Sequence, residues 1–236
     1  MSGTLYLLPV TLGQENHVDV IPPTVLDIAR RLDTFVVENE KSARQFLSSI
    51  KSTHPIRSLN LLTLNEHTHE RDIPQLLAPL LAGKDVGVMS EAGCPGIADP
   101  GAKLVALAHQ RGIHVRPLVG PSSILLGLMA SGLDGQRFCF HGYLPAEKNA
   151  RILKLKQIEQ RSAKSSETQI FIETPYRNQH MLEDILTHCQ PGSRLCVAVN
   201  LTLDNELVRT ASIQDWKQNT LPDLHKQPAV FLLLAK

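Results

Sequence analysis

The sequence predicts an α/β protein with two domains, the first built on a mostly parallel sheet and the second on a mixed sheet. Its 236 residues, 42% of them hydrophobic, suffice for two small domains with proper cores. Through residue 118, short apolar runs alternate with stretches of helical periodicity, as in parallel strands joined by helices. Towards the C-terminus, three apolar runs accompany one short helical stretch, which favours antiparallel pairing. We therefore expect domains at 1–119 and 120–236.

In the first domain, each predicted strand is a short apolar run and each predicted helix has an apolar face. Pro22 and Pro23 precede the first helix, and Ala43 and Phe46 lie on the apolar face of the second. Gly112 is a natural C-cap for the last helix. Strands are expected at 4–8, 35–37, 59–64, 86–89 and 114–118, and helices at 25–31, 42–50, 73–81 and 104–111.

The second domain begins with Gly-Pro-Ser-Ser at residues 120–123, where Ser122 is a candidate N-cap. The helix predicted at 148–164 has six basic residues and one acidic residue, Glu159. Its charged side is either a solvated face or a patch that faces RNA. Helices are expected at 124–131, 148–164, 181–189 and around Trp216, and strands at 138–141, 169–172, 195–199, 207–210 and 229–234.

The loop from Ser90 to Gly101, SEAGCPGIADPG, joins a buried strand to a helix and holds two acids, two prolines and three glycines. Glycine lets a ligand approach the main chain closely, and proline fixes the turns beside it. We expect Asp99 to be an N-cap and Pro100 the first helical residue. Such a loop is either an ordinary capped turn or a ligand site, because open α/β sheets bind ligands at the carboxyl ends of their strands.

Several function classes are excluded by missing motifs. No two glycines are two positions apart, so the G-x-G-x-x-G dinucleotide fingerprint is absent, as are the phosphate-loop and G-x-S-x-G motifs. Four scattered cysteines form no C-x-x-C pair, which predicts neither a zinc site nor a disulfide framework. With no signal peptide and no apolar run of membrane-spanning length, we expect a cytoplasmic protein. The net charge of +1 gives no global footprint for nucleic acid, but permits a local patch.

Five stretches in the same order resemble the tetrapyrrole methylase family, the class III S-adenosylmethionine-dependent methyltransferases. The similarity is greatest to the branch with the bacterial 16S ribosomal RNA 2'-O-ribose methyltransferases. One stretch, residues 12–17, matches the family poorly, and in the segment 38–41 only Glu38 matches cleanly. The matching stretches are Gly3–Tyr6 with Pro9, the loop 90–101, Gly120–Ser123, Gly142–Pro145 and Glu173–Arg177.

The resemblance implies that S-adenosylmethionine binds in a cleft between the two domains and that the protein is a homodimer. Nine of the fourteen glycines lie between Gly93 and Gly142, which also concentrates close backbone packing around the domain junction. Glu91 stands where the family has Asp. By the family's pattern, the cofactor-binding residues are Pro9, Glu91, Ala92, Gly93, Asp99, Ser122, Ser123, Tyr143, Leu144 and Thr174.

Methyl transfer requires alignment of the nucleophile, the methyl group and the sulfur, and a hydroxyl acceptor benefits from a base. Glu38, His67 and Glu91 are the candidate catalytic residues. His67 and His69 form a His-x-His pair without a third ligand at suitable spacing, so no metal site is predicted.

The favoured acceptor is an RNA ribose 2'-hydroxyl, with no DNA or membrane partner. Two alternatives stay open. One is a tetrapyrrole or other small acceptor, and the other is a protein that binds the cofactor without catalysis.

Overall fold

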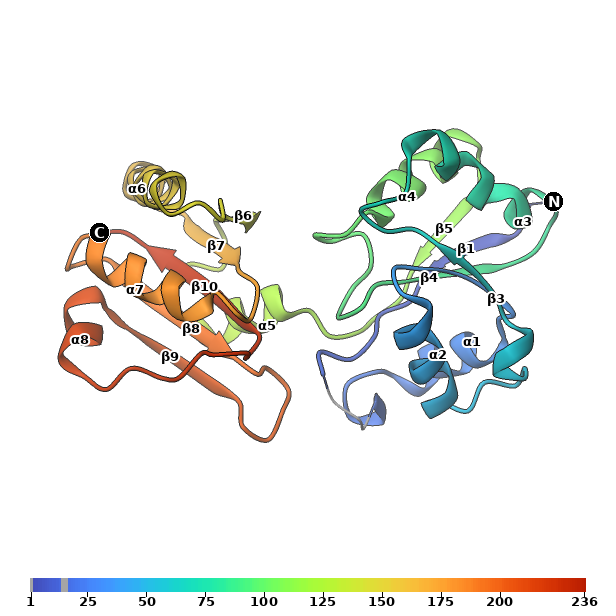
Figure 1. The fold of residues 1–236 in the computed structure, drawn as a ribbon, viewed down its shortest axis with the longest axis horizontal. Helices are drawn as coiled ribbons and strands as arrows, with labels where there is room; N and C mark the ends of the chain where they lie inside the picture. The colour runs from blue at the N-terminus through green and yellow to red at the C-terminus, as the bar shows by residue number, and fades with distance from the viewer. Residues whose placement is uncertain (1, 14–16) are drawn as a thin grey trace. The chain divides into compact units, whose positions relative to one another are not determined.

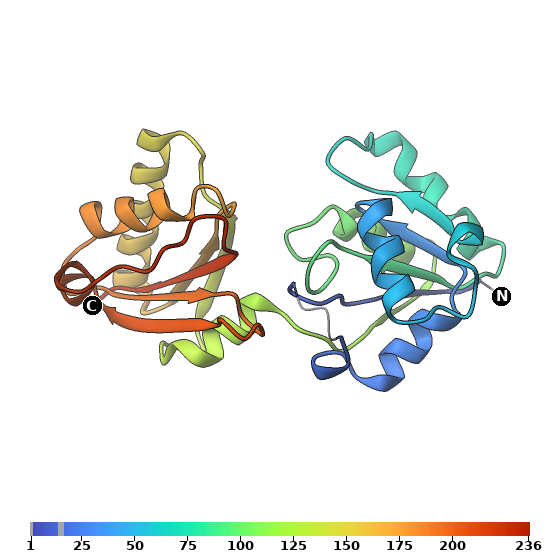
Figure 2. The same cartoon turned by 60° about the horizontal axis from the view of Figure 1, so that its bottom comes forward.

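The computed structural model describes residues 2–13 and 17–236. The chain divides into two compact units, Met1–Ser122 and Ser123–Lys236. Each unit has one five-stranded sheet with helices on both of its faces (Figures 1 and 2). The two α/β units predicted from the sequence are therefore confirmed.

Unit 1 contains a parallel sheet in the order β3-β2-β4-β1-β5. Helices α1 and α2 pack on one face around Phe35 and Val37, while η3, α3 and α4 pack on the other around Val36 and Val88. The strands are β1 (Thr4–Leu7), β2 (Thr34–Val37), β3 (Asn60–Thr63), β4 (Val86–Met89) and β5 (His114–Pro117). The helices are η1 (His17–Asp19), α1 (Pro23–Arg31), α2 (Glu40–Ser49), η2 (Ile56–Ser58), η3 (Glu70–Leu77), α3 (Ala78–Leu81) and α4 (Gly101–Gln110).

Unit 2 contains a mixed sheet in the order β6-β7-β10-β8-β9. Strands β6 and β7 are parallel, and the other neighbouring pairs are antiparallel. Helices α6, α7 and α8 cover one face, and α5 packs on the other through Leu128. The strands are β6 (Phe138–Tyr143), β7 (Thr168–Ile172), β8 (Arg194–Val199), β9 (Leu207–Ser212) and β10 (Ala229–Leu234). The helices are α5 (Ser123–Ser131), α6 (Lys148–Ser165), α7 (Asn178–His188) and α8 (Ile213–Gln218).

Three local predictions differ from the structure. The single helix expected at 73–81 is instead a 3-10 helix followed by one α-helical turn, because Pro79 has no N–H with which a continuous α-helix would bond the preceding turn. Helix α4 begins at Gly101, so Pro100 occupies the N-cap position predicted for Asp99. Strand β6 continues to Tyr143, and its register shifts between Phe140 and Tyr143, where Gly142 has φ +66°.

Candidate functional site

Two candidate catalytic carboxylates lie together at the carboxyl edge of the sheet of unit 1. Glu38 follows β2, and Glu91 comes two residues after β4, its neighbour in the sheet. The Glu91 N–H donates a hydrogen bond to Glu38 Oε2 at 3.0 Å. Ser42, in the first turn of α2, donates its hydroxyl to Glu91 Oε1 at 3.2 Å. Both side chains are therefore held in place by neighbours at the start of α2 and the end of β4.

Asp99 organises the glycine-rich loop through main-chain hydrogen bonds. Its Oδ2 accepts from the Gly96 N–H and its Oδ1 from the Gly101 N–H, both at 2.7 Å. A Cβ on Gly101 would lie 2.8 Å from Asp99 Oδ1, so this close approach requires glycine. Gly96 has φ +83° and Ala98 has φ +60°, so two nearby residues adopt the left-handed conformation. Asp99 thus accepts N–H groups on both sides of a tight turn.

The carboxylates of this edge form an uncompensated negative cluster. Burial raises the pKa of Glu38, and the charges of Asp99 and Glu91 raise it further, against the lowering effect of the Glu91 N–H. Burial likewise raises the pKa of Asp99, opposed by the two loop N–H groups. Among the described residues, none of the three carboxylates has a Lys, Arg or His within ion-pair distance. This environment favours a bound cation and suits Glu38 to accept a proton.

A cavity of about 670 Å³ opens beside Glu91. Its walls mix apolar side chains, including Phe46 and Met89, with the hydroxyls of Ser42 and Ser90. The remaining lining residues are Val10, Thr11, Gly13, His17, Ala43, Gln45 and Ser49. Polar side chains make up more than half of this lining, so the cavity suits a ligand that carries polar groups as well as an apolar part.

The other predicted residues of unit 1 lie around the same loop. Gly93 is buried with φ +72°, and its carbonyl accepts the Val10 N–H at 2.9 Å. Ala92 is exposed. Pro9 is buried and packs against Gly120. A Cβ added to Gly120 would lie 2.3 Å from the proline ring, so this contact requires glycine. Ser122 is the last residue of unit 1 and is half-buried.

His67 lies in the loop that follows β3, an edge strand of the sheet. Its side chain is 84% exposed, and its Nε2 lies 3.6 Å from Glu66 Oε1. None of its interactions within the described chain reaches Glu38 or Glu91. The structure thus brings two of the three candidate catalytic residues together and leaves His67 apart. No group of three potential metal ligands occurs among the described residues.

The predicted residues of unit 2 differ in exposure. Tyr143 is 57% exposed at the end of β6, whereas Leu144 is buried in the core under α6 and α7. Ser123 is the first residue of α5. The Thr174 N–H donates to Glu173 Oε1 at 2.6 Å.

Glu173 and Arg177 form an ion pair after β7. The sequence pointed to the stretch 173–177 but not to this pairing. Arg177 Nη2 lies 2.6 Å from Glu173 Oε1, and the Glu173 side chain is fully buried. This hydrogen bond raises the pKa of Arg177. Among the described residues, Glu173 Oε2 and Arg177 Nε are buried and have no hydrogen-bond partner. Such orphaned groups are costly, so a polar ligand at this corner would be stabilised.

Two more site residues escaped sequence reasoning, His17 and Ser42. His17 lines the cavity beside Glu91, and its buried Nδ1 has no partner among the described residues. It belongs to the stretch 12–17 that departs from the family pattern, of which residues 14–16 lie outside the described residues. Ser42 precedes a helical apolar face, and only the contact with Glu91 identifies it. The sequence signal for both residues was their place in the chain after strands of the parallel sheet, because ligands bind at the carboxyl ends of such strands.

The fold of two α/β units, with a carboxylate-bearing glycine loop in the first, and the family model that matches the chain together make it a methyltransferase. The chain belongs to the family of tetrapyrrole (corrin/porphyrin) methylases, whose family model matches residues 5–216. Family membership implies S-adenosylmethionine as the methyl donor.

The chain is similar to proteins named ribosomal RNA small subunit methyltransferase I. It is 33% identical to the Vibrio cholerae protein over 205 residues, which are 87% of this chain and 67% of that protein. It is 32% identical to the Escherichia coli O157:H7 protein over 211 residues, 89% of this chain and 70% of that protein. With the Xylella fastidiosa protein the identity is 29% over 234 residues, 99% and 81% of the two chains.

Solved structures share the fold at low sequence identity. The methyltransferase CobJ has a TM-score of 0.65 and 19% identity, covering 99% of this chain and 95% of its own. A conserved hypothetical protein from Aeropyrum pernix K1 has a TM-score of 0.66 and 16% identity, covering 100% and 86%. These likenesses concern the fold alone. Within the described part of the chain, no helix has the length and apolarity to cross a membrane.

Proposed function

We propose that this methyltransferase transfers a methyl group from S-adenosylmethionine to a ribose 2'-hydroxyl of small-subunit ribosomal RNA. The observation that carries the proposal is the half-buried Glu38, held by the Glu91 N–H in a cluster of carboxylates without a cationic partner. The ribosomal RNA methyltransferases that align over most of the chain support this choice of acceptor.

Glu38 is the proposed general base. When bound, the cofactor supplies an electrophilic methyl group on a sulfonium. Transfer forms a carbon–oxygen bond at the ribose, breaks the carbon–sulfur bond and requires the hydroxyl proton to leave. The Glu38 carboxylate accepts that proton, and burial, by raising its pKa, makes it a stronger base than an exposed glutamate.

Glu91 has the second role at this edge. Its main-chain N–H orients Glu38, and its own carboxylate, restrained by Ser42, attracts the positive charge of the cofactor. His67 is exposed on its loop, so we assign it to contact with the RNA acceptor instead of proton transfer.

The residues that we propose to hold the cofactor come from both units. Within unit 1, the carboxylate cluster suits the sulfonium of the cofactor. Within unit 2, the buried, unpartnered polar atoms of Glu173 and Arg177 suit a polar ligand group. Leu144 would act through its main chain, because its side chain is buried in the core. The proposed set is Pro9, Glu91, Ala92, Gly93, Asp99 and Ser122 of unit 1 and Ser123, Tyr143, Leu144 and Thr174 of unit 2.

Methylation of ribosomal RNA with a radiolabelled cofactor tests the proposal. Small ribosomal subunits and free 16S RNA should take up label, and nuclease digestion followed by mass spectrometry should recover a 2'-O-methylated nucleoside. Label in a small-molecule fraction would mean that the methyl acceptor is a small molecule and not RNA. Calorimetric binding of the cofactor without any transfer would instead identify a non-catalytic binding protein.

We also infer a homodimer in the cytoplasm. The family pattern suggests the dimer, and the proposed ribosomal substrate suggests the compartment. Light scattering coupled to size-exclusion chromatography should give twice the 26.1 kDa mass of the chain. A species of monomer mass at micromolar concentration would contradict the dimer.

A further inference from the structure

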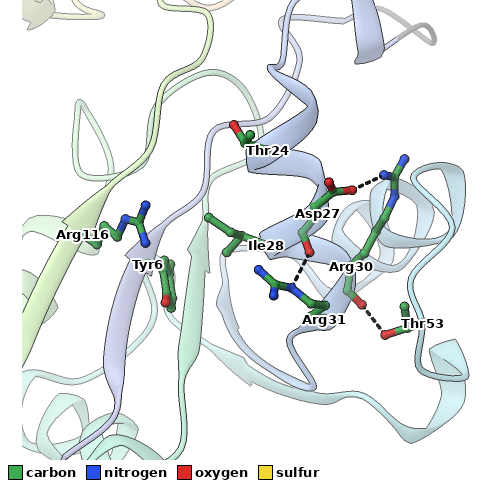
Figure 3. Close-up of a pocket in the computed structure, with 8 residues that line it drawn as sticks. All are labelled: Tyr6, Thr24, Asp27, Ile28, Arg30, Arg31, Thr53 and Arg116. Atoms are coloured by element: carbon green, nitrogen blue, oxygen red, sulfur yellow. Dashed lines mark hydrogen bonds and ion pairs between the residues drawn. The ribbon is translucent and has the colours of Figure 1, made fainter.

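Unit 1 has a second hollow, of about 530 Å³, which shares no lining residue with the cavity beside Glu91. We call it the arginine groove. Figure 3 shows Arg116 on one side, Arg31 on the other and Tyr6 between them. Its lining residues are Tyr6, Thr24, Asp27, Ile28, Arg30, Arg31, Thr53 and Arg116.

The fold places the two sides of the arginine groove on different elements. Tyr6 of β1 and Arg116 of β5 are register partners in parallel strands, so they stand on the same face of the sheet. The Arg116 guanidinium carbon lies 5.8 Å from the centroid of the Tyr6 ring. Helix α1 packs on this face and contributes Arg31 from its last turn. Because β5 is an edge strand, the groove is open beside it.

The positive charge of the arginine groove is only partly neutralised. Three arginines and one aspartate give its lining a formal charge of +2, being +3 and −1. Arg30 is engaged by Asp27 at 2.7 Å and by the Ile50 carbonyl at 2.6 Å. Arg31 donates its Nε only to the Asp27 carbonyl, at 3.1 Å, and within the described chain neither Arg31 nor Arg116 has a carboxylate partner.

Ordinary helix electrostatics accounts for only part of this arrangement. Cations in the last turn of a helix are stabilising, which explains Arg30 and Arg31. It does not explain Arg116, which comes from a strand and stands over an aromatic ring. Two unpaired guanidinium groups on either side of a tyrosine match the recognition of single-stranded nucleic acid, which combines basic side chains along the backbone with an aromatic platform.

We propose that the arginine groove binds backbone phosphates of a single-stranded segment of the RNA substrate, away from the reacting ribose. Arg31 and Arg116 each present a planar fork of N–H donors that matches a phosphate, and the Tyr6 ring lies under the Arg116 guanidinium and helps to orient it. The inference rests on the proposed function, since it names RNA as the partner. It adds a second anchor, on the α1 side of the sheet, to the acceptor site at the carboxyl edge.

The test measures fluorescence anisotropy of a labelled, short single-stranded RNA oligonucleotide with the full chain. R31Q/R116Q should weaken binding about tenfold and lower the slope of log K against log salt by about 1.4, since each phosphate contact of a single strand contributes about 0.7. R57Q/R111Q is the matched control, because Arg57 and Arg111 are exposed arginines of unit 1 outside the groove and without ion pairs in the described chain. It should keep the affinity within twofold.

Several results would overturn the inference. Equal losses of RNA affinity in R31Q/R116Q and the control would mean that RNA binding depends on overall charge and not on the groove. Displacement of RNA by millimolar inorganic phosphate would mean that the groove binds free phosphate. A change of oligomeric state in R31Q/R116Q would show that the arginine groove is an interface between copies of the chain. R31K/R116K, which keeps the charge but loses the planar fork, should keep the salt dependence with an affinity between those of the unchanged protein and R31Q/R116Q. A salt dependence as low as that of R31Q/R116Q would contradict the phosphate contacts. RNA binding through the groove without methylation would remove the proposed function and leave this inference standing.

Discussion

At the scale of single residues, the site depends on the environment of Glu38. The carboxyl group is half-buried beside two other carboxylates, and its one neutralising contact is the N–H of Glu91. Burial and like charges raise the pKa of this group, so its ionised form is less stable in the folded chain than in the unfolded chain. The same environment that makes Glu38 a useful base therefore costs stability at neutral pH.

Glu38→Gln should separate these two effects. We expect methyl transfer to fall by about 10²-fold or more, the usual contribution of a positioned base. In the unchanged protein the rate should fall as pH drops through the raised pKa of Glu38, and this acid limb should disappear in the variant. The melting temperature at neutral pH should rise, because the ionised carboxylate destabilises the folded state above its raised pKa.

Glu40→Gln provides the control, since Glu40 is exposed, pairs with Arg44 and lies two residues away. It should alter neither the rate nor the acid limb. Full activity of Glu38→Gln in pH-rate profiles would rule out Glu38 as the base and direct attention to His17, which lines the cavity beside Glu91.

Asp99 has a structural role that can be measured separately. Asp99→Ala should lower the free energy of unfolding by about 2 kcal/mol, because the Gly96 and Gly101 N–H groups lose a charged acceptor. Asp72→Asn, at a carboxylate that receives no main-chain N–H within the described chain, should stay within about 0.5 kcal/mol. Denaturant titration gives both values, and equal effects of the two changes would refute the assigned role.

At the scale of elements, α6 shows that its basic residues do not share one environment. Arg151 of α6 is buried, and its Nε–H donates to Asp184 Oδ2 of α7 at 2.8 Å while its Nη1–H donates to the Ala146 carbonyl. Glu159 is also buried, where it accepts from Ser193 Oγ and the Gln190 N–H. Lys156 and Lys164 are exposed. Two of the charges counted from the sequence therefore hold unit 2 together and do not contribute to a solvated face.

Arg151→Ala should be strongly destabilising, by about 3–5 kcal/mol, because it leaves the buried Asp184 carboxylate unpaired. The double variant Arg151→Met/Asp184→Leu should recover much of this loss, since an apolar pair needs no compensating charge. Chemical denaturation of the two variants makes the comparison. A double variant no more stable than Arg151→Ala would show that the lost contacts with the Ala146 carbonyl and the helix packing dominate.

The elements also show where sequence reasoning succeeds and fails. Apolar runs such as Phe35–Val37 identify buried strands because they are covered on both faces of the sheet. The prediction of one helix at 73–81 was wrong because the apolar spacing there is helical while Pro79 interrupts the hydrogen bonds. Arg151 and Asp184 are 33 positions apart, so their pairing depends on tertiary packing that periodicity does not encode.

At the scale of the whole molecule, the two-unit α/β fold was predictable, but the assembly of the site was only partly so. The loop 90–101 was recognisable from its density of glycine and proline. The contact of Glu38 with Glu91 follows from the strand order β3-β2-β4-β1-β5, in which β2 and β4 are neighbours although β3 lies between them in the chain. That order is a property of the folded sheet. Glu173 and Arg177 are only four positions apart, but the sequence does not show that they pair or that the Glu173 side chain is buried.

Cofactor binding should be visible as stabilisation of the whole chain. A ligand that binds only the folded state adds about 2.7 kcal/mol when its free concentration is a hundred times its Kd, so S-adenosylmethionine should raise the melting temperature in proportion to the logarithm of its concentration. The demethylated product should act similarly, and ATP, which lacks the sulfonium and the amino acid end, should not. Glu91→Gln should reduce the shift from S-adenosylmethionine more than the shift from the product, because only the former carries the positive sulfonium that the carboxylate cluster attracts. Equal reductions in differential scanning fluorimetry would mean that Glu91 contacts a part common to both molecules, and no shift at millimolar cofactor would remove the carboxylate edge as its site.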